Sequence, residues 1–305
     1  MDSRPSPKTG AQSITETRTA TPTGNLTANW PFSTANFKWL LIPLLFLALA
    51  ATTEAQRRGG GRGGFTARPA EPQDFDGTWQ FCRVAFRQNR NGDGGGWSVD
   101  YPRADINMSI RLSELTKTTV GFNGPEDPKH LVVRLTDPTL FQCPFIMMTE
   151  VGAAYMDDAE AEALRNYLLK GGFLWADDFW GEYAWEAWME QFGKALPSAL
   201  YPVTDLPKDH PLYRAVFDIA GGVPQIASIG NWLGTGSTSE RGAESAVPHA
   251  RAVIDKSGRI LALMTHNTDI GDSWEEEASN AQFFYEFSTK GYAFGINAIV
   301  FGMTH

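Results

Sequence analysis

The 305-residue chain has only two cysteines, Cys82 and Cys143. Neither the number nor the spacing of cysteines fits a zinc site, and the chain lacks the cysteine density of a small disulfide-held scaffold. The two thiols could pair in an oxidising compartment. Sequence alone does not show that their Cα atoms lie within bonding range, so this pairing stays open here.

Motifs of the common catalytic and cofactor sites are also missing. There is no G-x-S-x-G or G-x-C-x-G turn for a nucleophile, no H-E-x-x-H zinc motif and no G-x-x-x-x-G-K-[ST] phosphate loop. The run GTGSTS fails the dinucleotide pattern because its sixth residue, Ser239, is not glycine. Covalent catalysis is therefore disfavoured, we expect no cofactor, and we assign no metal ligand. Acid–base or metal-assisted hydrolysis stays open.

Positive charge is scarce in most of the chain. Residues 69–305 contain 18 Lys and Arg against 32 Asp and Glu, a formal charge of −14. Such a surface repels phosphate backbones, so we expect no nucleic-acid partner. Residues 56–73 are the exception, rich in Gly and Arg, and we interpret them as a flexible linker.

No hydrophobic run reaches the roughly 20 residues that a membrane-spanning helix needs. The longest candidate, residues 39–51 (WLLIPLLFLALAA), is interrupted by Pro43 and preceded by Lys38. Small residues follow it, with a cleavage position after Ala55. We therefore predict that residues 1–55 are a disordered leader plus a signal peptide, and that the protein is exported to the periplasm. The leader is long, so an uncleaved anchor through residues 39–51 is the alternative, and only in that form do we expect membrane contact.

Residues 74–305 alternate between strand and helix periodicities. Apolar runs predict strands near 78–86, 130–136, 145–151, 173–179, 250–255 and 259–265. Helical spacing predicts helices near 104–117, 156–172, 182–196 and 280–304. Strands and helices that alternate through short links form parallel sheets with right-handed crossovers. We therefore predict a single doubly wound α/β domain, with a mostly parallel sheet and helices on both of its faces.

Several acidic residues have the spacing of helix caps. Asp157 with Glu160 fits a capping box for the helix near 156–172, and Gly171 suits a left-handed end. Asp272 with Glu275 fits a second capping box. We interpret these residues as structural.

Polar side chains follow three predicted strands at their carboxyl ends. The residues concerned are Glu150, Asp177, Asp178, His266, Asn267 and Asp269. Open parallel sheets bind ligands in the crevice outside these ends, so we expect the six to share a cleft. Because strand side chains alternate, Asp177 and Asp178 point to opposite faces. We expect one of them to face the cleft and the other to cap the helix beginning near Gly181.

One segment, Gly221–His249, breaks the alternation of strands and helices. A patternless run of this length in a compact domain is usually a functional loop. Trp232 and His249 lie in it, and Trp180 lies beside the strand end at Asp178. We regard these three side chains as further ligand-binding candidates.

The runs VVRLTDPTLFQCPFIMMTEVG, LRNYLLKGGFLWADDFWG and TSERGAESAVPHARAV resemble one bacterial family of uncharacterised exported proteins, the domain of unknown function numbered four-one-five-nine. The resemblance implies a class I glutamine amidotransferase-like, flavodoxin-like fold and no established activity. Amidotransferases of this class carry a cysteine at a turn after a central strand. Neither MTEVGAA nor WADDFWG has one, and Cys143 precedes its strand, so we do not expect glutaminase activity.

Two functions remain open. The first is a non-catalytic binding domain of the cell envelope, whose acidic cleft and Gly221–His249 segment would hold a small molecule, glycan or envelope protein. The second is a hydrolase of envelope carbohydrate or peptide, with Asp177 or Asp178 and His266 as acid–base or metal groups. The missing nucleophile favours the first, whereas convergence of Glu150, Asp177 and His266 would favour the second.

Overall fold

A computed structural model describes residues 67–219 and 221–305. The predicted leader, signal peptide and anchor, and residues 56–66 of the Gly/Arg-rich linker, lie outside these residues. Within the described ranges, no helix is both long enough and apolar enough to cross a bilayer.

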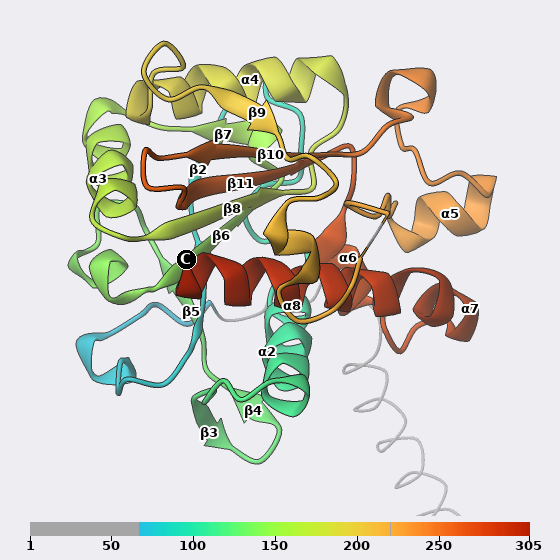
Figure 1. The fold of residues 1–305 in the computed structure, drawn as a ribbon, viewed down its shortest axis with the longest axis horizontal. Helices are drawn as coiled ribbons and strands as arrows, with labels where there is room; N and C mark the ends of the chain where they lie inside the picture. Colours follow the sequence, from blue (N-terminus) through green and yellow to red (C-terminus); the bar gives the residue numbers. More distant parts are fainter. Residues whose placement is uncertain (1–66, 220) are drawn as a thin grey trace, which may run out of the picture. The chain divides into compact units, whose positions relative to one another are not determined.

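A seven-stranded sheet forms the centre of the domain (Figure 1), in the order β5-β1-β6-β8-β11-β10-β9. The strands are β1 (Phe81–Val84), β5 (His130–Val133), β6 (Phe145–Thr149), β8 (Phe173–Asp177), β9 (Val203–Asp205), β10 (His249–Ile254) and β11 (Ile260–His266). The pairs formed by β5, β1, β6, β8 and β11 are parallel, whereas β10 is antiparallel to both of its neighbours. The predicted α/β class with a mostly parallel sheet is confirmed.

Two layers of helix cover the sheet (Figure 1). Side chains of α3 (Asp158–Leu169) and α4 (Gly181–Ala195) pack in one core, and those of α2 (Arg103–Leu115), α6 (Ile270–Glu275) and α8 (Thr289–Thr304) pack in the other. All five residues of β6 and all five of β8 are buried, as expected for parallel strands that are covered on both faces.

Shorter elements complete the domain. They are β2 (Arg87–Gln88) with β7 (Ala154–Tyr155), β3 (Phe122–Gly124) with β4 (Asp127–Pro128), α5 (Ile229–Thr235), α7 (Ala281–Phe283) and a π-helical turn at Phe284–Ser288. Single 3-10 turns lie at Pro72–Asp74, Pro138–Gln142, Val151–Ala153, Pro211–Arg214 and Gly242–Ser245.

Of the two predicted capping boxes, the structure contains one and lacks the other. At α3, Asp157 accepts from the backbone N–H of Glu160 at 3.0 Å, and Glu160 returns the bond at 2.9 Å, so this capping box is confirmed. The second predicted box is wrong, because α6 begins three residues earlier than expected. Its N-cap is Asp269, which accepts from the backbone N–H of Asp272 at 2.7 Å. Asp272 is thereby free for other contacts.

A disulfide joins Cys82 in β1 to Cys143, just before the neighbouring strand β6. The two Cα atoms are 6.2 Å apart, and both residues are buried. The bond therefore links adjacent parallel strands near the amino end of β6.

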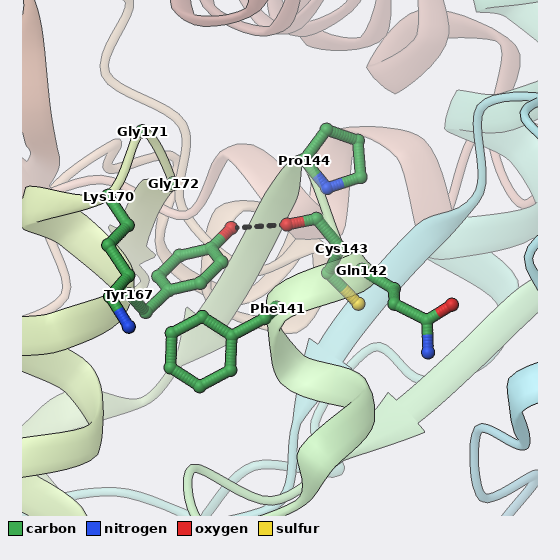
Figure 2. A pocket seen from close by; sticks show the side chains of 8 residues that line it. All are labelled: Phe141, Gln142, Cys143, Pro144, Tyr167, Lys170, Gly171 and Gly172. Atoms are coloured by element: carbon green, nitrogen blue, oxygen red, sulfur yellow. Dashed lines mark hydrogen bonds between the residues drawn. The ribbon is translucent and has the colours of Figure 1, made fainter.

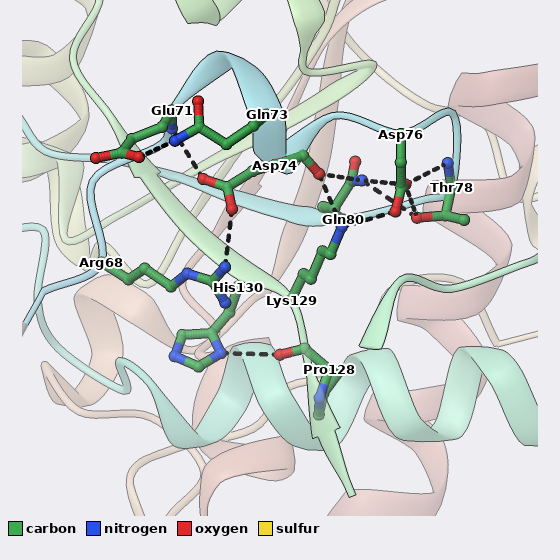
Figure 3. A network of polar contacts seen from close by, with 10 residues as sticks. All are labelled: Arg68, Glu71, Gln73, Asp74, Asp76, Thr78, Gln80, Pro128, Lys129 and His130. Carbon is green, nitrogen blue, oxygen red and sulfur yellow. Dashed lines mark hydrogen bonds and ion pairs between the residues drawn. The ribbon is translucent and has the colours of Figure 1, made fainter. Parts of the chain in front are cut away.

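A polar network holds the described beginning of the chain against β5 (Figure 3). Arg68 pairs with Asp74 at 2.8 Å, and Lys129 pairs with Asp76 at 2.7 Å. Lys129 also donates to the backbone carbonyl of Asp74 at 3.0 Å. The end of the predicted linker is thus attached to the edge strand.

The strand order locates a reversal in the sheet. From β1 the chain crosses to β5 on one side, and it then returns to β6 on the other side of β1. Connections that leave two adjacent parallel strands in opposite directions open a crevice outside their carboxyl ends. The strand order therefore predicts a crevice beside Glu150, which directly follows β6.

Candidate functional site

Three buried carboxylates converge beyond the carboxyl ends of the strands. Asp100 lies in the loop before α2, Asp178 directly follows β8, and Asp269 lies between β11 and α6. One carboxylate oxygen of each lies within 4.8 Å of those of the other two. Asp100, Asp272 and Glu275 form a second, overlapping group by the same measure. We call these five residues the carboxylate cluster.

The backbone is unusual at this edge of the sheet. Among the described residues, five that are not glycine have a positive φ, and four of them lie here: Asp100 (63°), Glu150 (54°), Asp178 (55°) and Asn267 (61°). Left-handed backbone at such residues costs free energy and persists where the surrounding structure demands it, often at functional sites. The turn at Asp178 also ends the alternation of β8 at Asp177.

Asp177 has a structural role within this edge. It is fully buried, accepts a hydrogen bond from the Thr265 hydroxyl, and accepts another from the backbone N–H of Gly271 at 3.0 Å, in the first turn of α6. Burial raises the pKa of Asp177 to about 7, although these hydrogen bonds oppose the shift. Asp177 therefore supports α6, while Asp178 joins the cluster.

The expectation that one of these aspartates caps the helix near Gly181 is wrong. The backbone N–H of Gly181 donates to Oδ1 of Asn267 at 2.8 Å, and that of Glu182 donates to Glu244 at 2.8 Å. Asn267 also donates to the carbonyl of Val247 at 2.9 Å, so its side chain holds two segments together.

Burial raises the pKa of Asp178 well above its usual range, and the nearby carboxylates of Glu150 and Asp100 raise it further. Its Oδ1 accepts from the indole N–H of Trp180 at 2.9 Å, which partly offsets these effects. Trp180 is itself buried, so it orients Asp178 instead of offering a stacking surface.

Asp100 is the least satisfied member of the cluster. It is 6% exposed, and its Oδ2 has no hydrogen-bond partner among the described residues. A Cβ atom at Gly271 would lie 2.5 Å from this oxygen and 3.5 Å from Oδ1 of Asp269. Glycine at position 271 therefore lets α6 approach Asp100. Burial raises the pKa values of Asp100 and Asp269 well above the usual range, and neighbouring carboxylates add to the effect.

One buried cation lies beneath the cluster. Arg83 in β1 is fully buried and pairs with Asp105 of α2, which is also fully buried. The attraction between Arg83 and the carboxylates of Asp105, Asp100 and Asp177 raises the pKa of the guanidinium despite its burial. Because Arg83 already has a carboxylate partner, it leaves most of the cluster's charge uncompensated.

Glu150 lies at the same carboxyl edge, directly after β6, and is partly buried. Burial raises its pKa to about 7, and the carboxylate of Asp93 adds to the shift. The backbone N–H of Gly95 lowers this pKa by hydrogen bonding, and Gly94 lies so close to the carboxylate that a side chain there would collide with it. The loop that contains Gly94 and Gly95 is thus folded closely against Glu150.

His266 stands apart from the cluster. Its Nδ1 accepts from Arg251 at 3.1 Å and its Nε2 donates to the carbonyl of Gly181 at 2.9 Å, so both ring nitrogens are occupied. The ring packs on Phe179 with centroids 5.0 Å apart. Burial lowers the pKa of His266 to about 4, which keeps the ring neutral at pH 7.

The two candidates in the Gly221–His249 segment contact other parts of the domain. Trp232 packs edge-on against Phe283 and Phe287, with centroids 5.8 and 5.3 Å away. His249 interacts with Asp205 through its Nδ1 at 2.9 Å. Neither residue belongs to the carboxylate cluster.

The Gly221–His249 segment itself is attached to the carboxyl edge. Its described residues include α5 and the 3-10 turn Gly242–Ser245. The backbone N–H of Ile229 donates to Oδ2 of Asp272 at 2.8 Å, and Gln225 donates to the carbonyl of Asn267 at 3.2 Å. In Figure 1, α5 and α6 lie at the same end of the sheet. The Gly221–His249 segment is therefore hydrogen-bonded to Asp272 of the carboxylate cluster and to the neighbouring Asn267.

A cavity of about 580 Å³ lies at the opposite, amino end of β6 and β8 (Figure 2). The residues that line it are Phe141, Gln142, Cys143, Pro144, Tyr167, Lys170, Gly171 and Gly172. Tyr167 donates to the carbonyl of Cys143 at 2.8 Å, and the ammonium of Lys170 lies 5.0 Å from the ring of Phe141. Its lining holds no carboxylate or histidine, so we place the functional site at the carboxyl edge.

Residues 81–303 match a protein family described as Domain of unknown function (DUF4159). No curated protein matches the chain.

Proposed function

The chain belongs to the DUF4159 family, and we propose that it is an exported domain that binds a ligand at the carboxyl edge of its sheet without covalent catalysis. One observation carries the proposal: Asp100, Asp178 and Asp269, from three separate parts of the chain, meet in a buried cluster. Among the described residues, each of the three accepts at most one hydrogen bond, and none has a positively charged partner in a salt bridge. Burying an ionised carboxylate without such compensation costs several kcal/mol. Folds retain such costs chiefly where function needs them.

The turn after β6 supports a binding role. Glu150 occupies the left-handed position between a central strand and the following 3-10 turn. In an amidotransferase-like fold, which we propose here, a cysteine would stand at such a turn. Both cysteines of this chain are instead joined in the disulfide. A carboxylate at this position suits recognition or proton transfer and does not suit acyl transfer.

Export is supported by the disulfide and by the apolar segment 39–51. Disulfides persist in oxidising compartments and are rare in the cytosol. We therefore propose a periplasmic location, or attachment to the membrane through residues 39–51 if the leader is retained. Partners in that compartment are a small molecule, a glycan or another envelope protein.

A hydrolase is the second candidate, and the pKa of Glu150 favours it. A carboxyl group with a pKa of about 7 is partly protonated at neutral pH, so it can act as a general acid or base. The proposed His266 partner does not support this function, because both of its ring nitrogens are already bonded.

The test uses the mature protein purified from the periplasm and a library of envelope glycans and peptides. We expect binding that Asp178→Asn weakens at least tenfold and that Asp158→Asn, an exposed change on α3, leaves intact. Binding that is indifferent to Asp178→Asn would place the site elsewhere. Conversion of the ligand, lost in Glu150→Gln, would establish the hydrolase instead.

A further inference from the structure

We propose that Asp100, Asp178 and Asp269 bind a hard divalent cation of the Ca²⁺, Mg²⁺ or Mn²⁺ class. The cation would be the first component of the proposed binding site, and its contact with a ligand rests on the proposed function. The presence of the cation rests on the cluster alone.

The spacing of the three carboxylates fits an ion. Their ligand oxygens lie within 4.8 Å of one another. For three atoms so spaced, some point lies within about 2.8 Å of all three, close to the roughly 2.0–2.6 Å bonds of Mg²⁺ and Ca²⁺. Small side-chain rotations are enough to close the difference.

An unpartnered oxygen points into the same space. Oδ2 of Asp100 is buried and has no hydrogen-bond partner among the described residues. A Cβ atom at Gly271 would lie 2.5 Å from this oxygen and 3.5 Å from Oδ1 of Asp269, so both oxygens border the same space beside Gly271. A buried acceptor without a partner costs about 1–3 kcal/mol, and more when it is charged. A cation between Asp100 and Asp269 would remove this cost.

The local charge also requires compensation. The cluster contains five carboxylates, whereas the guanidinium of Arg83 supplies one positive charge, pairs with Asp105, and keeps an Nη1 without a hydrogen-bond partner among the described residues. Five buried or partly buried carboxylates beside one guanidinium leave negative charge that a divalent cation would neutralise. A bound divalent ion and shared protons are therefore the two competing ways to stabilise the cluster.

The donor atoms select the class of ion. All five members of the cluster offer oxygen, which Ca²⁺, Mg²⁺ and Mn²⁺ prefer. The imidazole of His266 is occupied by Arg251 and Gly181, and the cysteines are bonded to each other. Zn²⁺ and Cu²⁺, which favour nitrogen and sulfur, are disfavoured. Three protein ligands leave coordination positions for oxygens of a ligand, such as a carboxylate or the hydroxyls of a glycan.

The experiment uses mature protein purified without chelator, whose metal content is measured by mass spectrometry. The protein is then stripped with EDTA and titrated with Ca²⁺, Mg²⁺ and Mn²⁺ in turn by calorimetry and thermal unfolding. We expect at least one stoichiometric site and a rise in Tm on adding one of these ions. Asp100→Asn and Asp178→Asn should each weaken the affinity at least tenfold, and Asp158→Asn should not.

The Asn variants keep the experiment decisive even if an aspartate is also structural. If protons alone stabilise the cluster, added ions should leave the Tm of wild type and of Asp100→Asn unchanged, whereas a cation site predicts a rise in wild type that Asp100→Asn loses. Absence of a stoichiometric ion, together with a Tm that none of the three ions raises, would overturn the inference.

The cation and the proposed ligand site can fail separately. Ligand binding that survives EDTA but is lost in Asp178→Asn would overturn the cation and retain the binding edge. A stoichiometric cation, combined with ligand binding that Asp178→Asn does not affect, would retain the cation and overturn the proposed function.

Discussion

Asp100 and Asp178 each combine a left-handed backbone with a buried carboxylate. Either feature alone is unfavourable, and local interactions compensate little for Asp100, whose Oδ2 has no partner among the described residues. Asp177, next to Asp178, is instead satisfied by Thr265 and Gly271. Adjacent aspartates at one strand end thus divide into a structural residue and a candidate ligand.

The buried pair of Arg83 and Asp105 gives the first prediction at this scale. Asp105→Asn should lower the free energy of unfolding by about 3–5 kcal/mol, because it leaves a buried guanidinium without a charged partner. Urea unfolding measures the change. Glu114→Gln removes the half-exposed partner of Arg111 and should cost less than about 1 kcal/mol. A loss below 1 kcal/mol in Asp105→Asn would show that the pair is unimportant.

His266 gives a prediction about acid. Its pKa is about 4 in the folded protein against an ordinary 6.5, so the unfolded chain binds the extra proton between these values. The contribution of His266 to stability is therefore complete above about pH 6.5 and is lost as pH falls toward 4. His266→Gln removes this titration. Relative to the variant, wild type should lose up to roughly 3 kcal/mol between pH 7 and pH 4. Equal pH profiles would contradict the assigned burial.

The position of a residue at the carboxyl edge could be predicted from the sequence where that residue directly follows an apolar strand. Sequence reasoning located Glu150, Asp178 and Asp269 at the carboxyl edge because each follows an apolar strand. It missed Asp100, since that residue lies in a loop without periodicity and only tertiary contacts bring it to Asp178. It also could not foresee that Arg251 of β10 and Gly181 would occupy His266.

At the level of secondary-structure elements, side chains in the short loops at the carboxyl edge of the sheet form hydrogen bonds to the first residues of the neighbouring helices. Asp269 caps α6, Asp272 accepts from the backbone of Ile229 at the start of α5, and Asn267 holds the start of α4. The same polar residues thus position three helices around the cluster. Movement of one helix would disturb the carboxylates directly.

The disulfide gives a prediction for two adjacent strands. It closes a loop with a sequence separation of 61 residues, for which chain entropy predicts about 4 kcal/mol of stabilisation. The double change Cys82→Ala with Cys143→Ala should lower the unfolding free energy by about 2–5 kcal/mol, measured by guanidinium denaturation without reductant. Detection of two free thiols in unfolded mature protein would refute the bond.

Most elements could be predicted because periodicity is a local property. The strands near 145–151 and 173–179 and the helix near 156–172 all formed within a few residues of their predicted bounds. β9 could not be predicted, because it has three residues, two of them polar, and depends on its pairing with β10. The antiparallel direction of β10 follows from its link to β11, which is too short for a crossover.

At the scale of the whole molecule, the domain places negative charge where its sheet order opens a crevice. Residues 69–305 carry a formal charge of −14. The carboxylate cluster places several of the acidic side chains together at the carboxyl edge of the sheet. Scattered surface carboxylates would serve solubility equally well. Their burial at the carboxyl edge is what points to a positively charged occupant.

The pH dependence of stability tests this charge distribution. Glu150, Asp177 and Asp272 have pKa values of about 7 when folded, against about 4 when unfolded. The folded state therefore binds more protons between these values, and in EDTA the contribution of these groups to stability is lost as pH rises from about 4 through 7. A cation that binds the ionised cluster should raise stability more at pH 7.5 than at pH 5. Urea unfolding with and without the cation measures both effects, and identical pH profiles in the two conditions would oppose cation binding.

Anomalous diffraction from crystals grown with Mn²⁺ shows whether the carboxylate cluster binds a cation, because it locates the ion. We predict an anomalous peak within about 2.0–2.6 Å of carboxylate oxygens of Asp100, Asp178 and Asp269. A well-ordered cluster without such a peak, in which these oxygens contact one another through shared protons, would contradict the account.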